Sequence, residues 1–102
     1  MKRVYVVVRR DLPGAHLTVQ AVHAAIAATF AYGNPRRTHP HLVLCGDENE
    51  QELIEVFEEL KEKSVPVCIY DEEDMKGQYT AMATGPLDEN QRKAMRKFRL
   101  LK

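Results

Sequence analysis

The sequence HLTVQAVHAA, residues 16–25, places two histidines and a glutamine inside a run of small apolar residues. In a helix of 100° per residue, His16, Gln20 and His23 share one stripe, because they are four and seven positions apart. A core histidine bonded to a backbone carbonyl or to Gln20 would explain His23. So would a polar cluster at the strand ends, where open α/β sheets bind their ligands.

A strand, a helix and a second strand are predicted in the first half of the chain. Residues 3–9 (RVYVVVR) are β-branched and aromatic, which is typical of a buried strand. Residues 17–32 have apolar side chains every three or four positions, and Gly33 follows as a helix C-cap. The residues at that spacing are Val19, Val22, Ile26 and Phe30. Six alanines allow this helix to approach a sheet closely, and HLVLC (41–45) is the second strand.

The clearest helix of the chain follows the second strand. Asp47 or Asn49 can cap it, and Glu50 or Glu52, three residues further on, completes a capping box. A helical stripe at positions i, i+3, i+4 and i+7 then consists of Leu53, Val56, Phe57 and Leu60. We therefore expect this helix to pack one apolar face against the sheet.

Two strands and a last helix are predicted beyond it. PVCIY (66–70) and YTAMAT (79–84) have strand character and are separated by the polar loop DEEDMKG. Asp88 and Gln91 are typical of a helix start, and the predicted helix extends to about Phe98.

The order of elements is β-α-β-α-β-β-α, which predicts a single three-layer α/β domain over residues 1–102 with a four-stranded mixed sheet. Helical crossovers join the first three strands, so these strands should be parallel. The third connection is too short for a helical crossover. The last two strands therefore form an antiparallel pair or meet across the sheet edge.

Composition is that of an ordinary globule, with 44% apolar and 29% charged residues. No apolar run approaches the roughly 20 residues that span a bilayer, and the N-terminus lacks a signal-peptide pattern, so we expect a cytoplasmic protein without a membrane partner. Cys45 and Cys68 lie in strand-like runs, where free buried thiols are expected.

Charge is unevenly distributed along a chain whose net charge is zero. Residues 47–74 carry a net charge of −10, and the remainder carries +10. The candidate phosphate-binding residues are Arg36 and Arg37 after the first helix, and Arg92, Lys93, Arg96 and Lys97 in the last helix. In that helix they would form a double stripe that binds nucleic acid, or a solvated face that balances the acidic helix.

Motifs for nucleotide phosphates and for a serine nucleophile elbow are missing from the sequence. His39–Pro40–His41 could chelate a metal, but two histidines around a proline in a loop are more often plain sequence. A metal-dependent hydrolase would use His16, His23, His39 and His41. We expect neither a metal nor a cofactor.

The segment VVRRDL followed by HLTVQAVHAA resembles the type-2 peptidyl-tRNA hydrolases of archaea and eukaryotes. Their signature is a strand that ends in an R-x-D-L-like turn, followed by K-x-A-A-Q-x-x-H-A-A. GQYTAMATGP is similar to the family segment G-T-x-T-x-L-A-I-G-P, and the resemblance covers essentially the whole chain. The closing KFRLLK is most similar to a divergent branch, the peptidyl-tRNA hydrolase domain-containing proteins.

The resemblance implies cleavage of the ester that joins a peptidyl or aminoacyl group to tRNA. Gln20 and His23 match the family motif, and Thr80 matches the second threonine of G-T-x-T. His16 stands where the family has lysine, and Gln78 stands at the first threonine. The family's loop after the third strand is replaced by the shorter DEEDMKG.

These matches and departures leave two functions open. In a hydrolase, Asp71 or Glu72 would orient His16 or His23, and one imidazole would take a proton from a water near Thr80. Alternatively, the fold would have lost its chemistry and would bind tRNA, a ribosome or a protein. tRNA is the expected partner, and related proteins are often homodimers, which an open sheet edge would allow here.

Overall fold

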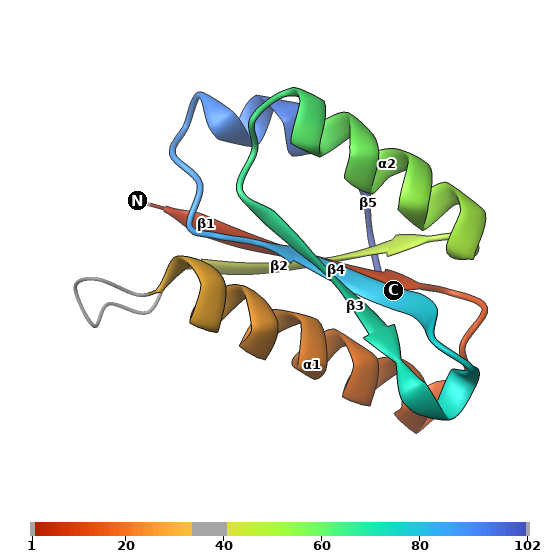
Figure 1. Cartoon of the computed structure of the whole chain (residues 1–102). Coiled ribbons are helices and arrows are strands. Elements are labelled where there is room, and N and C mark those ends of the chain that lie inside the picture. Colours follow the sequence, from red (N-terminus) through yellow and green to blue (C-terminus); the bar gives the residue numbers. More distant parts are fainter. Residues whose placement is uncertain (1, 34–40, 102) are drawn as a thin grey trace.

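A computed structural model of the chain describes residues 2–33 and 41–101, which form one α/β domain (Figure 1). Its strands are β1 (Arg3–Arg9), β2 (His41–Asp47), β3 (Val67–Glu72), β4 (Gln78–Thr84) and β5 (Arg99–Leu100). Its α-helices are α1 (Gly14–Tyr32) and α2 (Glu50–Glu62), and its 3-10 helices are η1 (Glu73–Met75) and η2 (Gln91–Met95). None of the helices described is long and apolar enough to cross a membrane.

The sheet has five strands in the order β3-β4-β1-β2-β5, so the prediction of four strands was wrong. β1 and β2 are parallel, and β3 and β4 form the antiparallel pair that was one of the two predicted arrangements. β3 runs in the direction of β2 but pairs only with β4, because the connection through α2 passes over β1 and β4. The mixed sheet therefore has β1 at its centre.

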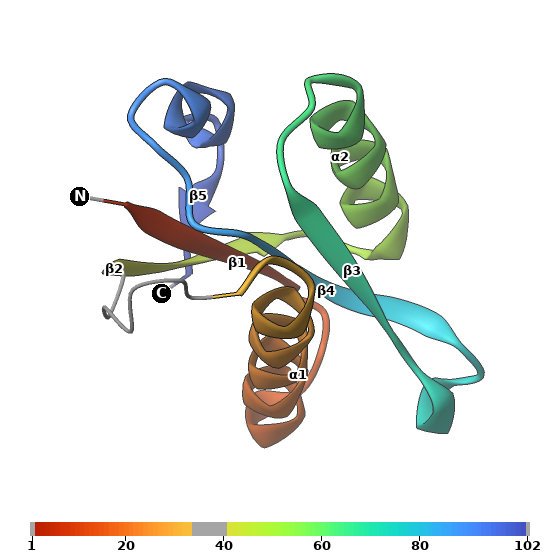
Figure 2. The same ribbon diagram turned by 60° about the vertical axis from the view of Figure 1, so that its left-hand side comes forward.

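The helices lie on opposite faces of this sheet, which gives the expected three layers. Figures 1 and 2 show α1 below the sheet, with α2 and the C-terminal η2 segment above it. α1 connects β1 to its neighbour β2. α2 connects β2 to β3, which lies at the opposite edge of the sheet. Because both connections keep the usual handedness, they place their helices on different faces.

α1 faces the sheet with alanines. Ala24 and Ala28 are almost completely buried and pack with Val6 and Val8 of β1. The stripe of larger apolar residues points away from the sheet and leaves Val19, Val22, Ile26 and Phe30 exposed. Small side chains on the buried face let the helix lie close to the strands, and Gly33 ends it as predicted, with its N–H bonded to Thr29.

α2 begins and packs as its sequence predicts. The Asn49 side chain accepts a hydrogen bond from the Glu52 N–H at 3.0 Å, which identifies Asn49 as the cap. Leu53 and Leu60 are fully buried, and Val56 is partly buried against the same core. This core fills the space above the sheet.

The predicted helix from Asp88 to Phe98 is wrong. Asp88 and Gln91 do form reciprocal capping hydrogen bonds, but the helix that follows is only the short η2. Met95 then anchors the segment in the core, and β5 pairs with the free edge of β2. The apolar spacing of this segment is compatible with a helix, but the unpaired edge of β2 provides hydrogen bonds that an isolated helix would leave unused.

The carboxyl end of β2 contains a buried acid. Asp47 is 4% exposed, and its Oδ2 has no hydrogen-bond partner in the described part of the chain. Burial, together with the neighbouring Glu52 carboxylate, raises the pKa of Asp47 to about 7, although Lys97 and Arg10 act in the opposite direction. The thiol of Cys45 on the same strand is buried as predicted, which raises its pKa to about 11, whereas Cys68 is only half-buried.

Replacing Ala24 by leucine should destabilise the fold. The larger side chain would push α1 off the strands, at a cost of about 1–3 kcal/mol in the free energy of unfolding. Urea denaturation measures this cost. The matched change Ala31→Leu, at an exposed position on the same helix, should leave the midpoint nearly unchanged. Equal midpoints for both variants would contradict the close packing of α1.

The free energy of unfolding should decrease as the pH rises from about 4 to about 7. The reason is that the unfolded chain releases the Asp47 proton near pH 4, whereas the native state keeps it up to about pH 7. Asp47→Asn should remove much of this slope, which is on the order of 2 kcal/mol over the window. The free energy of unfolding measured at several pH values tests this. The exposed Asp71→Asn is the control, and it should keep the wild-type slope.

Candidate functional site

The polar stripe of α1 meets the candidate residues of β3 and β4 at one end of the sheet. β1 and β3 end there, β4 begins there, and α1 starts beside the same end of the sheet. Ligand sites of open α/β sheets are found at this kind of edge, beyond the carboxyl ends of parallel strands. The topology thus brings into contact Gln20 and Thr80, which are 60 positions apart in the chain.

A row of three side chains crosses from β4 through α1 to β3. The Thr80 hydroxyl donates to Gln20 Oε1 at 2.7 Å, and Gln20 Nε2 donates to Glu72 Oε2 at 2.9 Å. Thr80 is 0% exposed and Gln20 is 1% exposed, so both ends of the buried amide are paired. Because the amide is fixed at both ends, its N–H group points at the carboxylate.

Glu72 is held in its ionised form. The Gln20 amide is the main cause that lowers the pKa of Glu72, and the backbone N–H of Asp74 acts in the same direction. The positive charge that His23 and His16 can carry lowers the pKa further. Both histidines therefore lie within electrostatic reach of Glu72.

His23 is partly exposed to solvent and contacts an aromatic ring. Its ring is half-buried and stacks on Tyr70 of β3, with ring centroids 4.8 Å apart and planes inclined by 11°. The stacking fixes the plane of the imidazole, and the residue as a whole stays partly exposed to solvent. A core histidine bonded to Gln20 is not what the structure has, since the Gln20 amide is taken by Thr80 and Glu72.

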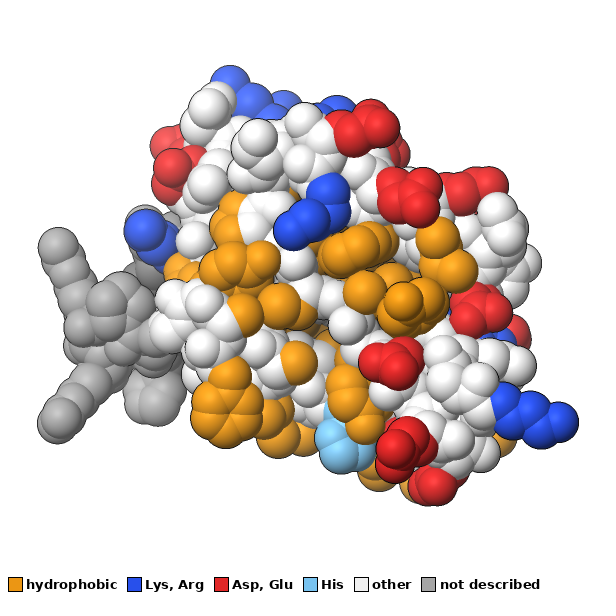
Figure 3. All heavy atoms as spheres, in the orientation of Figure 1, with side chains coloured by type: hydrophobic (Ala, Val, Ile, Leu, Met, Phe, Trp, Pro, Cys, Tyr) orange, Lys and Arg blue, Asp and Glu red, His pale blue; other side chains and the backbone are white. Residues whose placement is uncertain are grey.

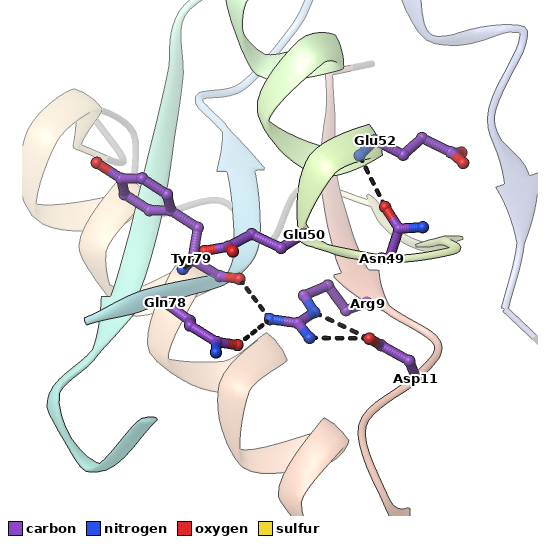
Figure 4. Close-up of polar contacts among 7 residues, drawn as sticks. All are labelled: Arg9, Asp11, Asn49, Glu50, Glu52, Gln78 and Tyr79. Atoms are coloured by element: carbon purple, nitrogen blue, oxygen red, sulfur yellow. Dashed lines mark hydrogen bonds and ion pairs between the residues drawn. The ribbon is translucent and has the colours of Figure 1, made fainter. Parts of the chain in front are cut away.

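Arg9, at the end of β1, forms hydrogen bonds that connect β1 to the start of β4. Figure 4 shows its guanidinium between Asp11 and the start of β4. It donates to both oxygens of Asp11 at 2.9 and 2.8 Å, to the Gln78 side chain at 3.0 Å and to the Tyr79 carbonyl at 3.1 Å. Arg9 is 7% exposed, so it fixes the turn and the strand that carries Thr80 rather than facing solvent.

The first turn of α1 has backbone N–H groups that no side chain caps, near the row formed by Thr80, Gln20 and Glu72. Pro13 is its N-cap, no side chain caps it, and its first turn contains no acidic residue. The first N–H groups of a helix have no intrahelical partner and carry a partial positive charge. The start of α1 can therefore stabilise a negative oxygen that forms near His16.

The structure distinguishes between the two acidic candidates. Glu72 bonds Gln20, whereas the neighbouring Asp71 is exposed and, after a register shift between Tyr70 and Asp71, lies opposite Tyr79. The extra residue at this shift is Thr80 of β4, whereas β3 alternates without interruption, so Glu72 lies on the same face of the strand as Tyr70, toward α1. Of the predicted site residues, His16, Gln20, His23, Glu72 and Thr80 come together, and Asp71 does not join them.

The basic candidates are not at this edge. Arg36 and Arg37 lie outside the described residues, as does His39. Arg92, Lys93 and Arg96 belong to the η2 segment on the face opposite α1, and Lys97 pairs with Glu59 of α2. The double stripe expected for an α-helix is not formed, because η2 is a short 3-10 helix. No group of three residues suited to a metal occurs in residues 2–33 and 41–101.

Three residues of the site are not predicted by the sequence analysis. Arg9 and Asp11 were seen only as parts of a motif, although a cation and an acid two positions apart at a strand end can form a bidentate pair. Tyr70 was treated as an ordinary strand residue. Its contact with His23 depends on how α1 crosses β3, and no local pattern indicates that contact.

Comparison with known proteins places the chain in a family. The sequence model described as peptidyl-tRNA hydrolase PTH2 matches residues 2–101. A solved structure of a protein of unknown function from Agrobacterium tumefaciens strain C58, Atu0240, is similar with a TM-score of 0.75 at 13% identity, over 99% of this chain and 98% of that chain. This likeness shows a shared fold, and no curated protein matches the sequence. Since the family match covers nearly the whole length, the chain belongs to the PTH2 peptidyl-tRNA hydrolase family.

Proposed function

We propose that this protein hydrolyses the ester bond between a peptidyl or aminoacyl group and tRNA. The observation that carries the proposal is the fixed row Thr80–Gln20–Glu72, which holds an ionised carboxylate beside two imidazoles at the ligand-binding edge of the sheet. Membership of the PTH2 family supports the same activity. Ester hydrolysis needs a base for water and a positive group for the oxyanion, and both are present at this edge.

His23 acts as the general base in this proposal. A water beside its imidazole loses a proton to the ring, and the resulting hydroxide attacks the ester carbonyl carbon. Glu72 stabilises the imidazolium, and the free N–H groups at the start of α1 stabilise the tetrahedral oxyanion. When the carbon–oxygen bond to the ribose breaks, the imidazolium returns its proton to the leaving ribose oxygen. The products are a free carboxylic acid and tRNA.

The remaining residues of the row position these groups. Thr80 and Gln20 are buried, so they act through Glu72 and do not touch the substrate. His16 occupies the place of the family lysine near the start of α1, within electrostatic reach of Glu72. The reaction proposed needs neither a metal nor a cofactor.

tRNA is the proposed partner, and the cytoplasm is the proposed location. The phosphates near the scissile ester would contact the end of the sheet where His16 lies. Arg92, Lys93 and Arg96 lie on the opposite face and would serve as a secondary contact for a more distant part of the tRNA backbone.

His23→Ala should lower kcat/KM by about 10²- to 10⁴-fold, since a positioned general base contributes roughly that much. Glu72→Gln keeps a hydrogen-bond acceptor for Gln20 but removes the charge, and it should cost about 10²-fold. The assay is ester loss from an N-blocked aminoacyl-tRNA. Asp71→Asn is the matched control and should retain activity.

No turnover by the wild type, combined with salt-sensitive tRNA retention, would contradict the hydrolase and support the non-catalytic tRNA-binding module. Activity that disappears with a chelator in the wild type would instead support the metal-dependent alternative. Wild-type turnover that His23→Ala leaves intact would show that another group is the base.

Thr80→Val should lower both stability and activity, because it removes the hydrogen bond from Thr80 to Gln20. It leaves the buried Gln20 oxygen without a donor, which costs about 1–3 kcal/mol in stability. We expect kcat to fall about tenfold with little change in KM, because a buried residue does not bind substrate. Thr80→Ser retains the hydroxyl and should restore most of kcat. If Thr80→Ser is as impaired as Thr80→Val, the hydrogen bond is not what matters.

A further inference from the structure

A second group of polar side chains surrounds the carboxyl ends of β1 and β2. These strands are parallel neighbours, yet the connection that follows β1 goes to one face of the sheet and the connection that follows β2 goes to the other (Figure 2). Open α/β sheets bind ligands in the crevice outside two strands whose connections part in this way. Arg10 follows β1 and Glu48 follows β2, so both residues lie at that crevice.

The crevice contains a cavity of about 400 Å³, which we call the β2-end cavity. Its volume is within the range of roughly 300–1,000 Å³ that is typical of small-molecule sites. α2 borders it on one side and the C-terminal segment on the other. The charged residues that line it are Arg10, Asp47, Glu48, Glu52, Lys97 and Arg99.

Asp47 presents an unused hydrogen-bond acceptor at the β2-end cavity. It is 4% exposed, and its Oδ2 has no partner among residues 2–33 and 41–101. Buried polar atoms of folded proteins are nearly always paired, because an unpaired one keeps the full cost of its desolvation. A hydrogen-bond donor on a molecule in the cavity would remove that cost.

The charges around the cavity are separated by element. The acidic side chains come from the end of β2 and the start of α2, and Figure 3 shows that acidic side chains continue along α2 in the upper part of the view. The basic side chains come from the end of β1 and from the C-terminal segment. Acids and bases in equal number therefore border one cavity.

Arg10 reaches the cavity because position 46 is a glycine. A Cβ on Gly46 would lie 2.6 Å from Arg10 Nε and 2.8 Å from Arg10 Cγ, which is closer than these atoms can pack. The glycine thus lets the Arg10 side chain cross β2 and donate to the Leu100 carbonyl of β5 at 3.1 Å. The adjacent Arg99 is exposed and has no ion pair in the described part of the chain, so its guanidinium can pair with an anion.

We propose that the β2-end cavity binds a free α-amino acid, whose ammonium group donates to Asp47 Oδ2 and whose carboxylate pairs with Arg99. Charged hydrogen bonds of these two kinds are stronger than neutral ones. The cavity is separate from the row Thr80–Gln20–Glu72, so the proposal goes beyond ester cleavage and does not depend on it.

The balance of charge selects this class of ligand. A phosphate or a nucleic-acid backbone would meet the carboxylates of Asp47, Glu48 and Glu52, and a simple cation would meet the bases. A molecule that carries both an ammonium group and a carboxylate can face both sets at once. The volume of the cavity leaves room for an amino-acid side chain beyond these two groups.

The ligand should compete with a proton at Asp47. Burial and the Glu52 carboxylate raise the pKa of Asp47 to about 7, against the opposite effect of Lys97 and Arg10. The Cys45 thiol beside it stays neutral, because burial raises its pKa to about 11. An ammonium group binds the ionised carboxylate, so the affinity should fall about tenfold from pH 8 to pH 6.

The test is a titration of the isotope-labelled full chain with each standard amino acid, followed by the backbone N–H chemical shifts of Gly46 and Glu48. Saturable shifts should give a dissociation constant of about 1 mM or below for at least one amino acid. Acetate, methylammonium and N,N,N-trimethylglycine are the control ligands, because each lacks one of the two charged groups or the N–H donor. They should bind at least about tenfold more weakly.

Asp47→Asn keeps the shape of the side chain and removes its charge, so it should weaken binding at least about tenfold and abolish the pH dependence. Arg99→Gln tests the carboxylate contact independently and should weaken binding about threefold, since Arg99 is exposed. Arg3→Gln is the matched control. Arg3 is an exposed arginine at the opposite end of β1, and its replacement should keep the wild-type affinity.

Three outcomes would overturn the proposal. The first is the absence of a saturable shift with every amino acid. The second is an affinity for acetate or methylammonium that equals the affinity for the amino acid, which would make the cavity a site for a simple ion. The third is an Asp47→Asn variant that binds as the wild type does.

Discussion

Close packing of an alanine-faced helix against the sheet is the constraint on which the other features depend. Because Ala24 and Ala28 leave little space between α1 and the strands, the Gln20 amide on the same helix comes within hydrogen-bond distance of β4 and β3. A buried amide must find partners on both its oxygen and its nitrogen. Thr80 and Glu72 supply them, and the helix position and the site geometry are thereby fixed together.

The same arrangement links stability to chemistry. The partner that satisfies Gln20 is an ionised carboxylate, and that carboxylate is the group that attracts the imidazoles of His23 and His16. Arg9 performs the complementary task on the other side of β4, where it holds the strand that carries Thr80. The proposed reaction relies on imidazole, carboxylate and free helix N–H groups.

Alanines on the buried face have a second consequence. The large apolar side chains of α1 are left for the opposite side, where Phe30 and its neighbours meet solvent together with Leu42 of β2. The helix α1 thus supports the site with its buried face and exposes large apolar side chains on the opposite face. The acidic helix α2 and the basic C-terminal segment meet on the far face of the sheet, where Lys97 pairs with Glu59.

The sequence alone determined the helices α1 and α2, the four long strands and the polar stripe, because alanine content, helical spacing and β-branched runs are local signals. It could not determine the fifth strand, since the segment after Asp88 is compatible with a helix until the free edge of β2 offers hydrogen bonds. Nor could it choose between Asp71 and Glu72, because the packing of α1 on the sheet decides which face of β3 meets the helix. Which side of α1 is buried was likewise decided by tertiary packing, since both alanines and larger apolar residues occur at helical spacing and only the small ones fit against the strands.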